Sequence, residues 1–165
     1  SENAGFGTPT RTSIFDYIGV PAHQSWMNHG QFDGGLSTPA EKSLRDFYQR
    51  LLSFSATSKA LTGQYQQIHT TNRQSTTGYT DKIFSFVRWS DDDRLIVISN
   101  FDDQQSHGFA LTIPAEVIKQ WQLADGSYPL VDQLYGQTAT LEVIDGVGRV
   151  NVSVDPLASL VYLVD

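Results

Sequence analysis

From residue 64 to the end of the chain, short stretches typical of β-strands follow one another with turn residues between them. Several of them alternate apolar and polar side chains, which is the pattern of a strand with one buried face. No helical pattern of comparable length lies between them, so the helical crossovers of a parallel sheet are missing. About eight strands at this spacing predict a mainly β fold, an antiparallel Greek-key β-sandwich. The clearest candidate strands are residues 82–89, 94–101, 108–113, 128–135, 138–145, 147–154 and 158–164.

One amphipathic helix precedes this region, in the segment STPAEKSLRDFYQRLLSF (37–54). Thr38 is a favourable N-cap, Pro39 suits the first helical position, and Glu41 completes a capping box with Thr38. A short helical turn that ends at Gly63 follows it. The apolar positions of the helix form one stripe, made of Leu44, Phe47, Tyr48, Leu51 and Leu52.

Residues 15–35, FDYIGVPAHQSWMNHGQFDGG, follow neither a helical nor a strand period. Their aromatic side chains should pack against something, and their glycines let the backbone turn. Long irregular loops of this kind often line a site on a rigid scaffold. We therefore predict an irregular loop and a helix in residues 1–62, and an all-β domain in residues 63–165.

Composition excludes several classes of function. The formal net charge of −7 disfavours nucleic-acid partners, which need basic patches. The absence of cysteine removes disulfides, thiolate nucleophiles and Cys-ligated zinc. No apolar run is long enough to cross a membrane, so no membrane partner is expected.

Two clusters could be considered for metal binding. His23, His29 and Asp33 have the right chemistry for zinc, but their spacing matches no known ligand pattern, and structural or surface histidines are the better interpretation. The acidic residues 91–93 and 102–103 lack the calcium-loop pattern and are interpreted as solvated turn residues. We predict no metal site.

Catalytic chemistry is equally hard to place. Glycoside hydrolysis needs two carboxylates held about 5 to 10 Å apart. Asp16 and Asp33 are the acids of the loop, and nothing in the sequence indicates that they converge. Trp26, Trp89 and Trp121 could stack on sugars, although packing is the commoner role of such residues.

Taken together, two stretches suggest a family. GFGTPTRTSIFDYIGVPAHQSWMNHGQFDGG (5–35) and the helix LRDFYQRLLSF (44–54) resemble the end of the catalytic TIM barrel in bacterial α-amylases of glycoside hydrolase family 13. The SKALTGQY element (58–65) and the strands after it look like the C-terminal all-β domain of the same family. The resemblance covers essentially the whole chain and is most specific in the loop and the helix.

This resemblance implies a parent enzyme that hydrolyses α-1,4-glucans with retention. Its three catalytic carboxylates would lie upstream of Ser1, so no catalytic residue carries over, and this chain alone should be inactive and need no cofactor. A calcium ion, if the parent binds one, belongs to the missing part. The loop after barrel strand eight would bring Arg11, Asp16, Tyr17 and Trp26 close to bound glucan. The alternative that Phe15, Tyr17 and Trp26 only anchor the loop to its own barrel stays open.

Three hypotheses follow. In the first, the chain is a non-catalytic C-terminal fragment whose β-domain stabilises the missing barrel, in a bacterial protein of the periplasm or the extracellular space. In the second, it is an independent carbohydrate-binding β-sandwich; exposed coplanar aromatic rings would favour this, and a buried Trp89 and Trp121 would count against it. In the third, the chain forms a dimer through Phe47, Leu51 and Leu52.

Overall fold

The computed structural model describes residues 21–91 and 93–164. The chain divides into two compact units, residues 1–49 and 50–165. The predicted domain boundary between residues 62 and 63 stays a prediction. In chain order the elements are α1 (Pro21–Met27), η1 (Asn28–Gly30), α2 (Pro39–Thr57), η2 (Lys59–Thr62), β1 (Gln64–Gln67), α3 (His69–Ser75), β2 (Ile83–Trp89), β3 (Arg94–Asn100), β4 (His107–Ile113), α4 (Ala115–Trp121), β5 (Gly126–Asp132), β6 (Thr138–Ile144), β7 (Val147–Val154) and β8 (Ser159–Val164).

Part of the segment predicted as an irregular loop is helical. Residues 21–27 form α1, and η1 follows directly. Pro21 occupies the first helical position, where its missing N–H costs nothing. The helix escapes sequence analysis because seven residues are too few to establish an apolar period.

The long helix α2 begins as the sequence predicts. Thr38 donates from its N–H to the Glu41 carboxylate at 2.7 Å, and the Glu41 N–H donates to the Thr38 hydroxyl at 3.3 Å. The Thr38 N–H and the Thr38 hydroxyl, which donates to the same carboxylate at 2.9 Å, hold the pKa of Glu41 below its usual value. The carboxylate therefore stays ionised at the positive end of the helix dipole, and the predicted capping box is confirmed.

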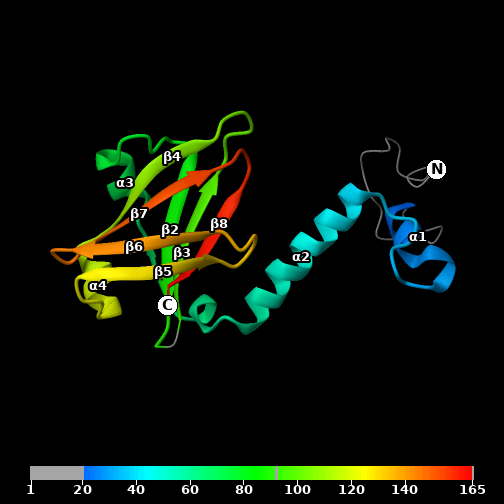
Figure 1. Ribbon diagram of the computed structural model, residues 1–165, viewed down its shortest axis with the longest axis horizontal. Coiled ribbons are helices and arrows are strands. Elements are labelled where there is room, and N and C mark those ends of the chain that lie inside the picture. The colour runs from blue at the N-terminus through cyan, green and yellow to red at the C-terminus, as the bar shows by residue number, and fades with distance from the viewer. Residues whose placement is uncertain (1–20, 92, 165) are drawn as a thin grey trace. The chain divides into compact units, whose positions relative to one another are not determined.

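The eight strands form one antiparallel sheet in the order β1-β2-β3-β8-β5-β6-β7-β4. The sheet curls on itself, so that β5, β6 and β7 lie across β2, β3 and β8 (Figure 1). The strands β5, β6 and β7 are joined in succession, and β4 pairs beside β7. This is a Greek key, and the predicted antiparallel sandwich is confirmed.

The core lies between the two halves of the curled sheet. Side chains of β2, β3 and β8 on one side meet those of β4 to β7 on the other. Helix α4, which the sequence analysis did not predict, adds Val117, Ile118 and Trp121 to this core. No helix in the described part of the chain combines the length and hydrophobicity needed to cross a bilayer.

Candidate functional site

Of the four residues that the resemblance placed near glucan, the structure describes one, Trp26. Trp26 of α1 is half-buried, and the Arg45 guanidinium lies 3.8 Å from the centre of its ring. Gly34 packs against the same ring so closely that a Cβ there would lie 2.6 Å from a ring carbon. A pocket of about 410 Å³ opens beside Trp26 and Arg45. Arg11, Asp16 and Tyr17 lie outside the described residues, so their proximity to glucan stays a prediction.

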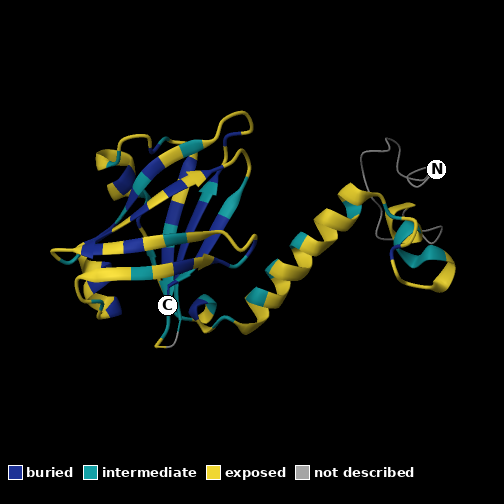
Figure 2. Ribbon diagram, viewed as in Figure 1, coloured by how far each residue is buried: buried dark blue, intermediate teal, exposed yellow. Residues whose placement is uncertain are grey.

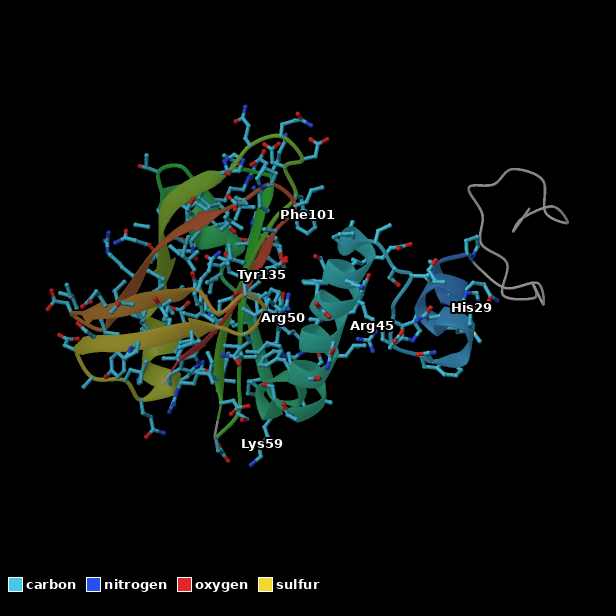
Figure 3. All side chains as sticks on the ribbon, turned by 45° about the vertical axis from the view of Figure 1, so that its right-hand side comes forward. His29, Arg45, Arg50, Lys59, Phe101 and Tyr135 are labelled. Atoms are coloured by element: carbon cyan, nitrogen blue, oxygen red, sulfur yellow. The ribbon has the colours of Figure 1, made fainter. Side chains whose placement is uncertain are left out.

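Asp33, considered above as a metal ligand, has a structural role in its turn. Its carboxylate accepts hydrogen bonds from the Asn28 side chain and the Gly35 N–H, each at 2.8 Å. Both hydrogen bonds lower the pKa of Asp33. His23 and His29 are both exposed, and His29 is labelled in Figure 3. Over residues 21–91 and 93–164, no group of three or more His, Cys, Asp or Glu side chains could hold a metal ion.

The two halves of the β-sheet differ on the side that points away from the core. Strands β6 and β7 alternate between buried and exposed side chains, apart from the half-buried Ala139 and Val147 near their first residues (Figure 2). Strands β3 and β8 are apolar on both faces, since Val97 and Val161 are buried yet lie opposite the core side. We call this second surface the outer face; it consists of Phe84, Phe86 and Arg88 of β2, Leu95, Val97 and Ser99 of β3, and Ser159, Val161 and Leu163 of β8.

A row of aromatic rings extends the outer face toward the sheet edge at β1. The ring centroids of Tyr65 and Phe86 are 5.5 Å apart, those of Phe86 and Phe84 are 6.0 Å apart, and those of Phe84 and His69 are 5.4 Å apart. Tyr65 and Phe84 are exposed. The planes of successive rings are inclined by 35° to 45°, so the row is an apolar strip and not a flat platform.

The two tryptophans of the β-domain are oriented for packing. Trp121 is 1% exposed, and its ring meets that of Trp89 edge to face at a centroid distance of 6.4 Å. A polar pocket of about 340 Å³ lies beside them, between the β2–β3 turn and α4. The Trp121 indole N–H has no hydrogen-bond partner among the described residues. Neither ring therefore offers a flat exposed face of the kind expected for a sugar platform.

Asp102 departs from the interpretation as a solvated turn residue. It is buried, and its carboxylate accepts from the Gln104 N–H at 3.0 Å, the Lys82 ammonium at 3.0 Å and His107 Nε2 at 3.1 Å. These donors, the Gln104 N–H first, hold the pKa of Asp102 far below its usual value. The earlier interpretation is wrong here because the fold buries the carboxylate and brings the Lys82 ammonium to it, while its other donors, Gln104 and His107, are close in sequence.

Asn100 extends the same network. Its amide donates to the backbone carbonyls of Gln105, Val154 and Asp155 at 2.8, 3.1 and 3.1 Å, and its oxygen accepts the Asp102 N–H at 2.8 Å. Asn100 and Asp102 therefore fasten the β3–β4 loop to the turn between β7 and β8.

Arg50, in the last turns of α2, joins that helix to the β5–β6 turn. Its Nε donates to the Leu134 carbonyl at 2.6 Å, and its guanidinium lies 5.9 Å from the Tyr135 ring centre (Figure 3). Asp132 shapes the same turn by accepting the N–H groups of Tyr135 and Val161 at 2.7 and 2.8 Å. Sequence analysis did not single out Arg50, because its partner is a backbone carbonyl.

Comparison with known proteins gives one family and one fold. A family model described as the alpha amylase C-terminal all-beta domain matches residues 74–165. Among solved structures, AmyP in complex with maltose is 20% identical over 78% of this chain, with a TM-score of 0.52. An AmyP variant in complex with maltotriose is 20% identical over 79%, with a TM-score of 0.50. An Anoxybacillus alpha-amylase is 17% identical over 82%, with a TM-score of 0.52.

The chain spans about a quarter of the length of these solved structures. It covers 22% of the AmyP–maltose chain, 23% of the AmyP variant and 25% of the Anoxybacillus enzyme. No curated protein matches the sequence.

Proposed function

The chain belongs to the family of alpha amylase C-terminal all-beta domains, and from this premise we propose that it is the non-catalytic C-terminal part of an enzyme that hydrolyses α-1,4-glucans. In this proposal the β-domain stabilises a catalytic barrel by covering part of it. The substrates are starch, glycogen and maltooligosaccharides. The protein is bacterial and acts in the periplasm or outside the cell.

The proposal rests on a contrast between two surfaces of the sheet. On β6 and β7 most side chains that point away from the core are exposed, whereas on β3 and β8 side chains on the outer face are apolar and buried. A sheet whose outer side meets water alternates apolar and polar side chains, as β6 and β7 do. Strands that are apolar on both faces are normally covered on both. Leu95, Val97 and Val161 of the outer face are already buried within the chain, so the surface left for a protein partner is the ring row, where Tyr65 and Phe84 are exposed.

Helix α2 carries a second apolar surface. Leu44, Tyr48 and Leu52 are exposed and recur every four residues, which places them on one side of the helix. Helices in proteins owe most of their stability to packing of such a stripe. A catalytic barrel of the same protein supplies that packing in our proposal, with α2 as its last helix.

Carboxylate chemistry agrees with a non-catalytic role. A retaining glycosidase needs a carboxylic acid with a raised pKa beside an ionised nucleophile. In the described residues the carboxyl pKa values that depart from normal are lowered, at Asp33, Glu41, Asp81 and Asp102. Each of these groups is held ionised by its donors and is unsuited to donate a proton to a leaving group.

An independent carbohydrate-binding module is the second candidate. The exposed row of Tyr65, Phe86 and Phe84 favours it, because aromatic rings stack on sugars. The inclination of these rings and the burial of Trp121 count against it.

Two measurements test the proposal. The complete gene product should hydrolyse maltoheptaose, whereas residues 1–165 alone should not, and removal of residues 64–165 should lower the temperature at which activity is lost. A complete product that lacks α-glucan hydrolysis would contradict us. Calorimetric titration of residues 1–165 with maltoheptaose, beside Tyr65→Ala and Phe84→Ala, tests the second candidate, because these two rings of the row are exposed. Binding abolished by either variant in a folded protein would establish it, and no heat from folded protein would reject it for α-glucans.

A further inference from the structure

Strand β4 lies at one end of the sheet, and among the described strands it pairs with β7 alone. Thr112 of β4 directs both its N–H and its carbonyl to Asn72 of α3, on the side away from β7. Alternate residues of a strand point their backbone groups to the same side, so those of Gly108 and Ala110 point there too. Such a row of outward backbone groups is a template on which another strand can form.

The sequence of β4 does little to prevent such pairing. From Gly108 to Ile113 it reads GFALTI, without a charged residue and without proline. Natural edge strands often carry charges or proline, which keep other strands away. Uncharged segments of six or seven residues with high β-propensity pair readily with copies of themselves. Protection of this edge must therefore come from another part of the fold.

Residues 69–79, which comprise α3 and the turn after it, supply that protection, and we call them the cover. Helix α3 contacts β4 (Figure 1). The Asn72 side-chain amide both donates to Thr112 and accepts from it, at 2.8 Å each. A side-chain amide has the donor and the acceptor of a peptide group. Asn72 therefore makes the two hydrogen bonds that a residue of a neighbouring strand would make.

The other end of the cover follows β4 equally closely. The ring of Tyr79 meets that of Phe109 edge to face, at a centroid distance of 5.1 Å. The backbone of Gly78 approaches β4 so closely that a Cβ there would lie 2.8 Å from the Gly108 carbonyl oxygen. Gly78 also has a φ of +85°, which glycine adopts readily. The cover therefore extends along β4 from Thr112 to Gly108.

A few buried polar groups hold the cover in place. The Tyr79 hydroxyl lies 2.8 Å from the Ser85 hydroxyl of β2 and 3.1 Å from His69 Nδ1. Tyr79 and Ser85 are buried. Within α3 itself, Asn72 is the one buried residue. The helix therefore has no apolar stripe to hold it, and its attachment to β4 depends on the Asn72 amide.

We propose that the cover keeps β4 from pairing with β4 of a second copy of this chain, and that its release exposes a self-association site. A second copy is the fitting occupant because two identical antiparallel strands, related by a two-fold axis, satisfy the edges of both copies at once. The segment GFALTI carries no charge that would repel that copy. This inference is independent of the proposed function, because it concerns only the edge of the β-domain.

The test measures the sedimentation of residues 1–165 at several concentrations. Every variant also carries Leu52→Ser, so that the apolar stripe of α2 does not contribute to association. Asn72→Ala removes the amide that stands in place of a strand. Gly78→Ala forces the cover away from β4 while Asn72 is left unchanged.

Two further variants separate edge pairing from a general loss of stability. Leu160→Ala opens a cavity in the core at β8, a strand that does not pair with β4, and leaves the cover unchanged. Ala110→Lys, combined with Asn72→Ala, places a charge in the middle of the β4 edge, where lysine opposes pairing. Circular dichroism shows which variants are folded.

We expect Asn72→Ala and Gly78→Ala to dimerise at least about tenfold more tightly than Leu160→Ala, which is the difference that one or two backbone hydrogen bonds make. Adding Ala110→Lys should return the Asn72→Ala variant to a monomer. If Asn72→Ala does not fold, Gly78→Ala, alone and with Ala110→Lys, decides the question.

Three results would overturn the inference. The first is association of Leu160→Ala as tight as that of the two cover variants, since destabilisation alone would then explain it. The second is a cover variant that is folded and stays monomeric. The third is association that persists when Ala110→Lys is added, because the copies would then meet at another surface.

Discussion

Asn72 and Thr112, separated by 40 positions in the chain, exchange two hydrogen bonds. The side-chain amide nitrogen of Asn72 donates to the backbone carbonyl of Thr112, and the Thr112 N–H donates to the side-chain oxygen of Asn72, both at 2.8 Å. Asn72 is fully buried and also bonds the Ile68 carbonyl and the Thr76 hydroxyl. One side chain thus fixes α3 to β4.

Replacing Asn72 with alanine should destabilise the fold by about 2–4 kcal/mol, because buried backbone groups of Thr112 lose their partner. Chemical denaturation of residues 1–165 measures this. Asn151→Ala is the control, since Asn151 is exposed on β7 and its loss should matter by less than about 0.5 kcal/mol. Equal free energies of unfolding for the two variants would show that the exchange contributes little.

Asp102 should make stability depend on acidity. Its pKa in the folded protein lies far below the unfolded value of 3.8, so its contribution is present above pH 3.8 and is lost as pH falls toward the folded pKa. Asp102→Asn should therefore be less stable than the natural protein at neutral pH, and the gap should narrow below pH 3.8.

Unfolding curves of both proteins at several pH values give this gap directly. Asp103→Asn is the control, because that neighbouring carboxylate is exposed and makes no hydrogen bond within the described residues. A gap that stays constant down to strongly acidic pH would exclude the carboxylate charge as its cause.

Gly148 should not tolerate a side chain. A Cβ at this position of β7 would lie 2.8 Å from Leu141 Cδ1, 2.9 Å from Ile118 Cδ1 and 3.0 Å from Ile113 Cβ, inside a packed core. Gly148→Ala should cost about 1–3 kcal/mol through overpacking. Gly108→Ala, on the neighbouring strand, meets nothing closer than the Val152 carbonyl at 3.8 Å and should lower the melting temperature far less. The reverse order would contradict this account of the core.

The apolar stripe of α2 should drive self-association when no barrel covers it. The predicted dimer through Phe47, Leu51 and Leu52 remains untested; Leu52 is exposed, while Phe47 and Leu51 are half-buried. We expect residues 1–165 to form dimers at high concentration in sedimentation experiments. Leu52→Ser should abolish them, and Ser53→Ala, an exposed neighbour, should not. A monodisperse monomer of the unsubstituted chain would reject the dimer.

Local patterns in the sequence were enough for most regular elements. The alternation in residues 147–154 coincides with β7, and the Thr38–Glu41 capping box marks the start of α2. The candidate strand 128–135 began two residues after the start of β5 and ran three residues past its end, where Asp132 accepts the Tyr135 N–H and turns the chain toward β6. The segment HTTNRQS of α3 has no apolar period, so nothing local indicated a helix there.

The sequence by itself determined the elements whose side chains repeat: the strands, the capped helix and therefore the antiparallel sandwich. It also indicated the family, through the residues of the loop and the helix. Only the tertiary structure decided that β3 and β8 are buried on both faces and that Asp102 and Asn72 are buried structural groups. These relationships depend on residues far apart in the chain, and periodicity reports only on neighbours within one element.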